Sequence, residues 1–314
     1  MVVYMKGQIN NKLHNSDIFM ITEQILQSGN NRIPEAQASG ISEIPVEQLF
    51  DLLACTNRIR AENKADKVFA CSIVNAKSGL CSQDCAFCAQ SSSHRTGIET
   101  WPLMSENELL GRAIAMEKSG ATRFSIVTSG LRMTAKELDR ICRAARKIRK
   151  ETDLRLCASL GMISEEKARE LKESGISRYH HNIETAESFF ENICTSHRFE
   201  DNINTIENVR SAGMKVCSGG ILGLGESWKQ RVELAFTLFN LNVDSIPLNF
   251  LNPIPGTRLE NKPILSPVDA LKCICLFRFV NPTKDIAICG GREITLRDFQ
   301  SLIFAAGANG VMVG

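Results

Sequence analysis

The chain lacks the sequence features that are typical of nucleic-acid-binding, membrane and secreted proteins. Its 314 residues carry 37 Lys and Arg against 35 Asp and Glu, and no basic stretch alternates with aromatic residues, so no nucleic-acid partner is expected. No apolar run approaches the length of a membrane span, so no membrane partner is expected either. The first ten residues lack the charged and then apolar layout of a secretory signal. These absences together predict a cytoplasmic protein.

Cysteine, in contrast, is plentiful. The chain has 12 cysteines, and nothing marks it for an oxidising compartment. We therefore expect free thiols that are available to metals, with disulfide pairing as the alternative.

One unit recurs along the chain: a short apolar strand, a loop, an amphipathic helix that begins at a good cap, and a glycine at the helix end. The expected strands are residues 68–75, 123–128, 155–160, 178–183, 215–222, 245–251, 285–289 and 310–313. Eight such units in about 250 residues predict an α/β fold, the (β/α)8 TIM barrel. An open, doubly wound sheet is the alternative.

The N-terminal part of the chain does not follow this pattern. Residues 1–42 are predicted to be a polar, irregular N-terminal arm, and residues 43–314 to form the barrel domain. Within the latter, residues 43–64 are predicted to be a helix that caps the bottom of the barrel.

Three cysteines, Cys81, Cys85 and Cys88, stand within eight residues. Three thiolates can hold a 4Fe-4S cluster and leave its fourth iron open to a small molecule. A structural zinc site needs a fourth ligand nearby, and an electron-transfer cluster needs four cysteines. The loop follows the first strand, and in such barrels the loops after the strands build the active site. A zinc site with a remote fourth ligand is the alternative.

Three more cysteines lie inside expected strands: Cys157 in the third, Cys217 in the fifth and Cys289 in the seventh. Alternate strands of a barrel fill the same interior layer, so these thiols can converge there. We therefore predict a second metal site, although each thiol alone is more simply a small buried hydrophobe. The other cysteines are expected in the core of helices (Cys55, Cys142, Cys273, Cys275) or are left open (Cys71, Cys194).

Two segments offer groups for a small-molecule ligand. Residues 219–226, GGILGLGE, follow the fifth strand; the glycines let the backbone approach a planar ligand, and Ile221 offers an apolar wall.

In the fourth strand, alternation sends His180, Asn182 and Glu184 to one face and His181 to the other. Polar side chains facing the interior are costly to bury without a ligand. A carboxylate there can hold ribose hydroxyls, and an amide can hold a ureido group, whereas His181 is expected to be a satisfied core or rim histidine.

The three-cysteine loop, with Phe87 before its last cysteine, resembles the cluster loop of radical S-adenosylmethionine enzymes. More narrowly, the chain resembles the biotin synthase family, and the likeness covers residues 45–314. The segments that carry it are NAKSG at 75–79, CAFCAQSS at 85–92, YHHNIET at 179–185, KVCSGG at 215–220 and GGRE at 290–293.

The resemblance implies a 4Fe-4S cluster on Cys81, Cys85 and Cys88 whose open iron binds S-adenosylmethionine. It implies that Phe87 and the glycine-rich loop contact the adenine and that Glu184 contacts the ribose. Asn182 and Asn249 would hold the ureido ring of dethiobiotin. The full set of implied contacts is Phe87, Asn182, Glu184, Gly219, Ile221, Gly223 and Glu226 for the cofactor, and His180, Asn182 and Asn249 for the substrate.

The reaction that the resemblance implies is radical sulfur insertion. An electron splits S-adenosylmethionine, the resulting 5′-deoxyadenosyl radical takes hydrogen from dethiobiotin, and an auxiliary iron–sulfur cluster donates the sulfur that completes biotin. The family also implies a small reductant, such as flavodoxin or ferredoxin, and a homodimer.

The chain departs from the best-known members of the family at the auxiliary cluster. Those members hold a 2Fe-2S cluster with three cysteines and an arginine, and the matching positions here are Ser125, Cys157, Cys217 and Ala287. Cys289 stands two residues after Ala287, hence on the same face of its strand. We therefore expect Cys157, Cys217 and Cys289 to bind a four-iron auxiliary cluster that carries an extra sulfide. His180 and Glu184 replace an asparagine and an aspartate of the familiar pattern.

Two other functions remain open at this point. One is a different radical enzyme on the same barrel, such as a hydrogenase-maturase-like enzyme or a mutase, which would not need the three strand cysteines as a set. The other is a non-catalytic iron–sulfur redox sensor, which would not cleave S-adenosylmethionine.

Overall fold

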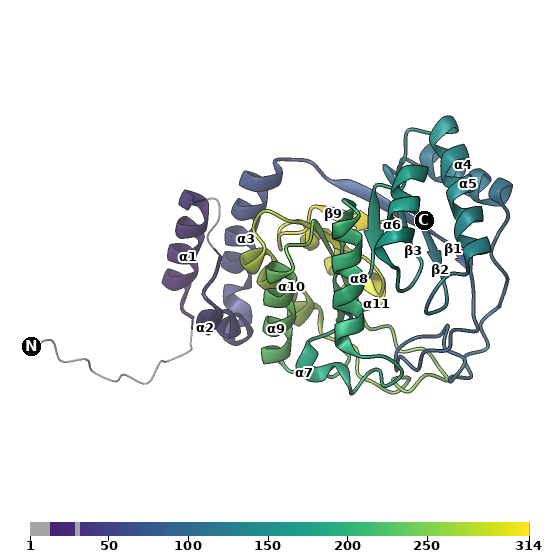
Figure 1. Ribbon diagram of the computed structural model, residues 1–314. Helices are drawn as coiled ribbons and strands as arrows, with labels where there is room; N and C mark the ends of the chain where they lie inside the picture. Colours follow the sequence, from purple (N-terminus) through teal and green to yellow (C-terminus); the bar gives the residue numbers. More distant parts are fainter. Residues whose placement is uncertain (1–12, 29–31, 314) are drawn as a thin grey trace, which may run out of the picture.

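The computed structural model of the chain describes residues 13–28 and 32–313, and its centre is a closed barrel of parallel strands (Figure 1). The strands pair in the order β5-β4-β3-β2-β1-β9-β8-β7-β6, and a further pairing of β5 with β7 closes the sheet. The strands are β1 (Phe69–Lys77), β2 (Arg123–Thr128), β3 (Arg155–Ser159), β4 (Arg178–His180), β5 (Lys215–Cys217), β6 (Gly220–Leu222), β7 (Ser245–Phe250), β8 (Asp285–Ile288) and β9 (Gly310–Met312). The (β/α)8 prediction is confirmed; the strand expected at 215–222 is divided into β5 and β6.

Helices follow the strands along the chain and cover the outside of the barrel (Figure 1). They are α4 (Glu106–Lys118), α5 (Ala135–Glu151), α6 (Glu165–Ser174), α7 (Glu187–Phe190), α8 (Phe199–Ser211), α9 (Trp228–Asn240), α10 (Pro267–Val280) and α11 (Arg292–Leu296), which continues into the 3-10 helix η3 (Arg297–Ile303). The capping boxes that start α4 and α5 are formed by Ser105 with Glu108 and by Thr134 with Glu137. Each box satisfies backbone N–H groups that a helix start leaves without partners.

The N-terminal residues are helical where an irregular arm was expected, so that expectation is wrong for the described part. Helix α1 (Asn15–Ser28) and the short helix α2 (Glu35–Ala38) precede the barrel. Ile18, Ile21 and Ile25 of α1 are buried, and their spacing of three and four residues is the apolar stripe of an amphipathic helix. The residues before 13 lie outside the described part of the chain.

The helix expected at 43–64 begins later, as α3 (Leu49–Lys64), after the 3-10 turns η1 (Ser39–Glu43) and η2 (Val46–Gln48). It packs against α1 and α10 at the side of the barrel (Figure 1). Only its last turn, Glu62 to Lys64, reaches the opening at the N-terminal ends of the strands. The end of the barrel is therefore bordered by this helix while a cavity stays open there.

Within residues 13–28 and 32–313, no helix combines the length and apolar composition that crossing a bilayer would require.

Candidate active site

The barrel encloses a cavity of about 290 Å³. Its wall contains groups from most strands and from the loop after β1, which contributes Phe87. The lining residues that sequence analysis selected are Phe87, Cys157, His180, Asn182, Glu184, Cys217, Ile221, Asn249 and Cys289. The interior of the barrel therefore brings together the expected auxiliary thiols and the expected cofactor and substrate groups.

The three strand thiols Cys157, Cys217 and Cys289 face this common space, as their placement on alternate strands predicted. Burial raises the pKa of Cys157 to about 12 and also raises the pKa of Cys217 and of Cys289. Without a metal these thiols are protonated at neutral pH; bound iron would displace the proton, because thiolate is the ligand form. The donor set is one that iron–sulfur clusters use.

A fourth thiol, Cys71 of β1, lines the same cavity. Sequence analysis placed Cys71 in the first strand and left its role open. Burial, together with the neighbouring Cys217, raises its pKa to about 11. Ser125 and Ala287, which stand where the family pattern has ligands, also line the cavity.

The polar wall of the cavity comes from β4 and the residues after it. His180, Asn182 and Glu184 face inward, whereas His181 faces outward and its Nε2 lies 2.9 Å from Asn202 Oδ1 on α8. Both parts of the alternation prediction are confirmed. The Nδ1 of His180 lies 3.5 Å from Cys217 Sγ, so the polar wall adjoins the thiol set.

Glu184 combines an unusual backbone with a perturbed side chain. Its φ is +66°, a conformation that costs a non-glycine residue about 1 kcal/mol or more. Burial raises the pKa of its carboxyl group to about 7, although Asn182 Nδ2 donates to it at 3.2 Å. A residue that combines a strained backbone with a perturbed carboxyl pKa and lies beside a cavity is typical of a ligand-binding position.

Glycines hold this segment against the next strands. A side chain at Gly220 would place its Cβ 2.3 Å from the Glu184 carbonyl oxygen, and one at Gly219 would be 1.9 Å from the Pro247 oxygen. The amide of Ile221 donates to that Glu184 oxygen at 2.8 Å. The glycine pair thus permits a backbone contact that no other residue allows, and this contact fixes Glu184 in its position.

The two expected substrate amides already bind backbone groups. Asn249 accepts from Gly290 N at 2.9 Å and donates to Gly220 O at 3.3 Å. The side-chain oxygen of Asn182 accepts from Gly219 N at 3.1 Å. These contacts orient both amides at the cavity wall.

The three-cysteine loop is anchored at both ends. Cys81 N donates to Gln90 O at 3.0 Å, and Ser92 N donates to Cys81 O at 2.8 Å, so the loop closes on itself. In the middle, the carboxylate of Asp84 accepts from the amide and hydroxyl of Thr195 at 3.0 and 2.6 Å. The spacing of the three cysteines is therefore held by contacts that involve none of their thiols.

A cysteine that sequence analysis left open lies beside this loop. Cys194 Sγ is 3.8 Å from Cys85 Sγ and 3.1 Å from His197 Nδ1. Within residues 13–28 and 32–313, Cys85, Cys194 and His197 are the one trio whose ligand atoms lie within 4.8 Å of one another. The hydrogen bond from Cys85, with a further one from His197, lowers the pKa of Cys194.

The expected cofactor residues of the glycine-rich loop divide into two groups. Ile221 reaches the cavity, whereas Gly219, Gly223 and Glu226 are absent from its wall. Glu226 is buried and accepts from Gly223 N at 2.9 Å, from Gly225 N at 3.0 Å and from Arg231 Nε at 2.7 Å. Its carboxylate therefore holds the loop in shape. Its place at the end of a glycine run had predicted contact with the cofactor instead.

Comparison with known proteins places this site in a class. Residues 77–238 match the Radical SAM superfamily, and residues 247–314 match the Biotin and Thiamin Synthesis associated domain. Among solved structures, methylornithine synthase has the same fold, with a TM-score of 0.82 at 17% identity over 93% of this chain and 85% of that one. The FeFe-hydrogenase maturase of Carboxydothermus hydrogenoformans gives a TM-score of 0.79 at 17% identity, over 95% and 70% of the two chains. The chain is thus a radical S-adenosylmethionine enzyme.

Sequence relatives narrow the assignment further. The biotin synthase of Syntrophus aciditrophicus is 50% identical over 299 residues, which are 95% of this chain and 92% of that protein. The biotin synthase of Carboxydothermus hydrogenoformans is 46% identical over 299 residues, 95% and 91% of the two chains. The chain belongs to the biotin synthase family.

Proposed function

We propose that this enzyme converts dethiobiotin into biotin by radical sulfur insertion, with the sulfur supplied at a thiol-lined site inside the barrel. One observation carries the proposal beyond family membership. Cys157, Cys217 and Cys289 share a single cavity with Phe87 of the cluster loop and with the polar wall of β4. A substrate bound there would lie between the two sets of thiols.

At one end of this space, Cys81, Cys85 and Cys88 would hold a 4Fe-4S cluster with S-adenosylmethionine on its open iron. The contacts of Asp84 and Gln90 hold the loop in shape before any cluster binds. Phe87 and Ile221 offer apolar surfaces to the adenine, and Glu184 offers a carboxylate to the ribose. When bound, the cofactors supply the radical and the sulfur, while the chain positions the substrate and excludes water.

Asn182, Asn249 and His180 are the proposed contacts of dethiobiotin. The two asparagines are held by backbone groups, so little rotamer entropy remains to be lost when a ureido ring binds. His180 adjoins Cys217, and burial lowers the pKa of its imidazole. A neutral imidazole can donate or accept one hydrogen bond beside the substrate without adding a buried charge.

At the other end, Cys157, Cys217 and Cys289 would hold the auxiliary cluster. The family's 2Fe-2S pattern does not fit the wall, because Ser125 and Ala287 occupy two of its four ligand positions. Three thiolates suit a four-iron cluster whose remaining iron carries the sulfide to be inserted. This proposal requires that Cys71 does not ligate, since a fourth thiolate would occupy that iron.

The remaining parts of the proposal concern partners and compartment. A small reductant of the flavodoxin or ferredoxin type would supply the electrons, and the enzyme would act as a homodimer. All cysteines in the described residues are free thiols. Free thiols and iron–sulfur sites both suit the reducing cytoplasm.

Anaerobic turnover tests the proposal directly. The reconstituted enzyme is mixed with dithionite, S-adenosylmethionine and dethiobiotin, and biotin and 5′-deoxyadenosine are measured together. We expect both products in the wild type and loss of biotin in Cys217→Ala. Cys142→Ala, which removes a buried thiol on the outer helix α5, is the matched control and should keep biotin formation.

Two results would contradict the proposal. Formation of 5′-deoxyadenosine with no biotin would indicate another radical reaction on this barrel. Absence of S-adenosylmethionine cleavage in a fully reconstituted sample would indicate a redox-sensing protein.

A further inference from the structure

A second cavity, of about 880 Å³, opens at the N-terminal ends of the strands, away from the cluster loop. Four consecutive strands each begin with a basic residue that lines it: Arg123 of β2, Arg155 of β3, Arg178 of β4 and Lys215 of β5. Lys64 and Lys67 complete the basic residues of the wall. We call this opening, defined by these six residues, the basic mouth.

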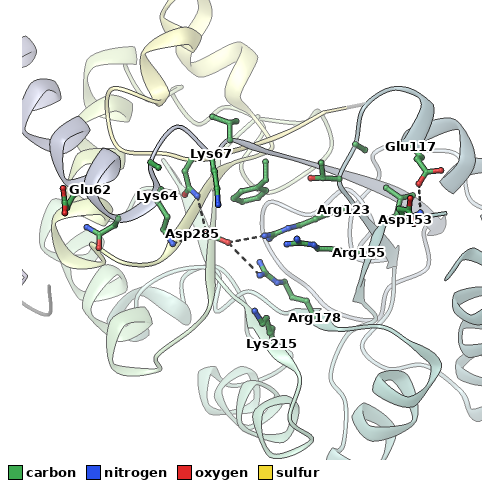
Figure 2. A pocket seen from close by; sticks show the side chains of 18 residues that line it. Glu62, Lys64, Lys67, Glu117, Arg123, Asp153, Arg155, Arg178, Lys215 and Asp285 are labelled. Atoms are coloured by element: carbon green, nitrogen blue, oxygen red, sulfur yellow. Dashed lines mark hydrogen bonds and ion pairs between the residues drawn. The ribbon is translucent and has the colours of Figure 1, made fainter.

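One carboxylate stands at the centre of the basic mouth (Figure 2). Asp285 lies 3.2 Å from Lys64 Nζ, 3.3 Å from an Arg123 nitrogen and 4.0 Å from an Arg178 nitrogen. The side chains of Arg155 and Lys215 approach the same region from two sides (Figure 2). Glu62, Glu117 and Asp153 lie toward the edges of this view (Figure 2), and together with Asp285 they set four carboxylates against the six basic side chains of the wall.

The excess of positive charge is unfavourable for the barrel itself. Arg123 lies opposite Arg155 in the pairing of β2 with β3, and Arg178 lies opposite Lys215 in the pairing of β4 with β5. Like charges that face each other on neighbouring strands destabilise a sheet. A bound anion would relieve both pairs at once.

Arg178 is the strongest sign of a missing partner. Its side chain is 10% exposed, and its contact with Asp285 at 4.0 Å is too long for a hydrogen bond. No hydrogen bond of its guanidinium occurs within the described part of the chain. A buried guanidinium that points into a cavity with its donors unused is a site for an anion.

The basic mouth borders the cavity of the thiols. Phe69, Arg123 and Arg178 line both cavities, and Arg123 lies over the Phe69 ring at 4.2 Å. Arg178 is also the register partner of Cys157. These three side chains are therefore the partition between solvent at the bottom of the barrel and the thiols inside it.

We propose that the basic mouth binds hydrosulfide from solvent and holds it beside the strand thiols, so that the auxiliary site is resupplied with sulfur from the end of the barrel opposite the cofactor. This inference rests on the proposed function, because only an enzyme that consumes its own sulfide needs such a supply. Entry of sulfide at the N-terminal ends of the strands also leaves the substrate and S-adenosylmethionine undisturbed at the C-terminal ends.

The step in which hydrosulfide binds is redox-neutral; the two electrons that the formation of two carbon–sulfur bonds would leave on the auxiliary irons would return to the small electron carrier in a separate step. One sulfur leaves in each biotin, and hydrosulfide brings one sulfur at the oxidation level of a cluster sulfide. Its single proton is released to solvent when the sulfur binds iron, and no electron is exchanged. A small monoanion is attracted by the excess positive charge of the basic mouth.

Binding is tested with bromide, a monoanion of similar size, by the bromide-81 NMR line width of the reconstituted protein. We expect excess line width that added sodium hydrosulfide reverses. The double variant Arg155→Glu with Lys215→Glu should reduce this excess about tenfold, because it replaces two positive charges of the basic mouth by negative ones. Both residues are exposed, so the substitutions do not alter the buried core. Lys136→Glu with Lys150→Glu, on the exposed face of α5, makes the same charge change and should have no effect. Equal broadening in the mouth variant would overturn the proposal.

Resupply is tested by comparing the first turnover with later ones at limiting sulfide. We expect the ratio of later to first biotin formation to fall about tenfold in Arg155→Glu with Lys215→Glu, and by less in Arg155→Gln with Lys215→Gln. In the wild type this ratio should also fall as salt is added, because salt screens exposed charges. A mouth variant with the wild-type ratio would overturn the inference, whereas absence of biotin in the wild-type first turnover would contradict the proposed function instead.

Discussion

The surroundings of each cysteine decide what its thiol can do. Cys142 and Cys275 lie on helices in the core, where the nearest polar contacts are a backbone oxygen and a threonine hydroxyl. Cys157 is also buried and Cys289 is partly buried, but both face a cavity that other thiols share. Residue type alone does not separate these cases, whereas position on a strand of a closed barrel does.

Cys71 is the residue at which the ligand set can be tested most finely. We expect Cys71→Ser to keep about eight irons per chain and to keep biotin formation, because the proposed auxiliary site uses three thiols. Cys289→Ser, a substitution of the same kind on the same cavity, should fall to about four irons and lose biotin. Iron and sulfide analysis with turnover measures both; loss of iron in Cys71→Ser would show that the auxiliary site has four thiolates.

Glu184 gives a prediction on pH. Its folded pKa of about 7 lies above the ordinary 4.5, so the folded state holds a proton that the unfolded state has already released between these values. Stability of the metal-free protein is therefore lost as pH rises from about 4.5 to 7, and Glu184→Gln should remove this loss, a gain on the order of 2 kcal/mol at pH 8 and little at pH 4. Denaturant unfolding at both pH values measures it, with the exposed Glu187→Gln as control. An identical gain at both pH values would contradict the assignment.

At the scale of elements, the glycine-rich loop after β5 depends on one buried ion pair. Glu226 and Arg231 are 2.7 Å apart with side-chain exposures of 2% and 11%, and the same carboxylate holds two loop amides. The loop is thus shaped from its far end, and its backbone can approach a planar ligand without the carboxylate touching that ligand.

Removing this brace should weaken both folding and cofactor binding. We expect Glu226→Ala to cost about 3 kcal/mol in the free energy of unfolding, because it leaves a buried guanidinium and two amides without their acceptor. Glu226→Gln keeps one acceptor oxygen and should cost less. Denaturant unfolding and equilibrium dialysis of S-adenosylmethionine measure the two effects. Unchanged stability in Glu226→Ala would contradict the bracing role.

Strands were more predictable from the sequence than the N-terminal segment. Arg123–Thr128 is flanked by turn residues and buried on both faces, so a short apolar run was enough to identify it. In contrast, α1 precedes the repeating units; Phe19 and Met20 separate its first two isoleucines, and three polar residues separate the second from Ile25, so the stripe does not stand out within the mostly polar N-terminal segment. Its burial depends on α3, a contact that no local pattern encodes.

At the scale of the whole molecule, the two ends of the barrel have different chemistry. The C-terminal ends of the strands carry the cluster loop and polar wall, and the sequence predicted this because motifs and alternation are local. The basic mouth at the other end was missed. Arg123, Arg155, Arg178 and Lys215 are far apart in sequence and form a set only when the strands align. The role of Glu226 was missed for a different reason: its partners Gly223, Gly225 and Arg231 are near in sequence, but a glycine run by itself indicates ligand contact rather than a loop held by a carboxylate.

The central claim is that one barrel holds two separate iron–sulfur sites, on the loop thiols and on the strand thiols. Iron and sulfide analysis with Mössbauer spectroscopy of the reconstituted protein tests it most directly. We expect about eight irons per chain in the wild type, about four when Cys81, Cys85 and Cys88 are replaced by alanine, and about four when Cys157, Cys217 and Cys289 are replaced. A wild-type protein with about four irons, or a strand-thiol variant that keeps about eight, would contradict it.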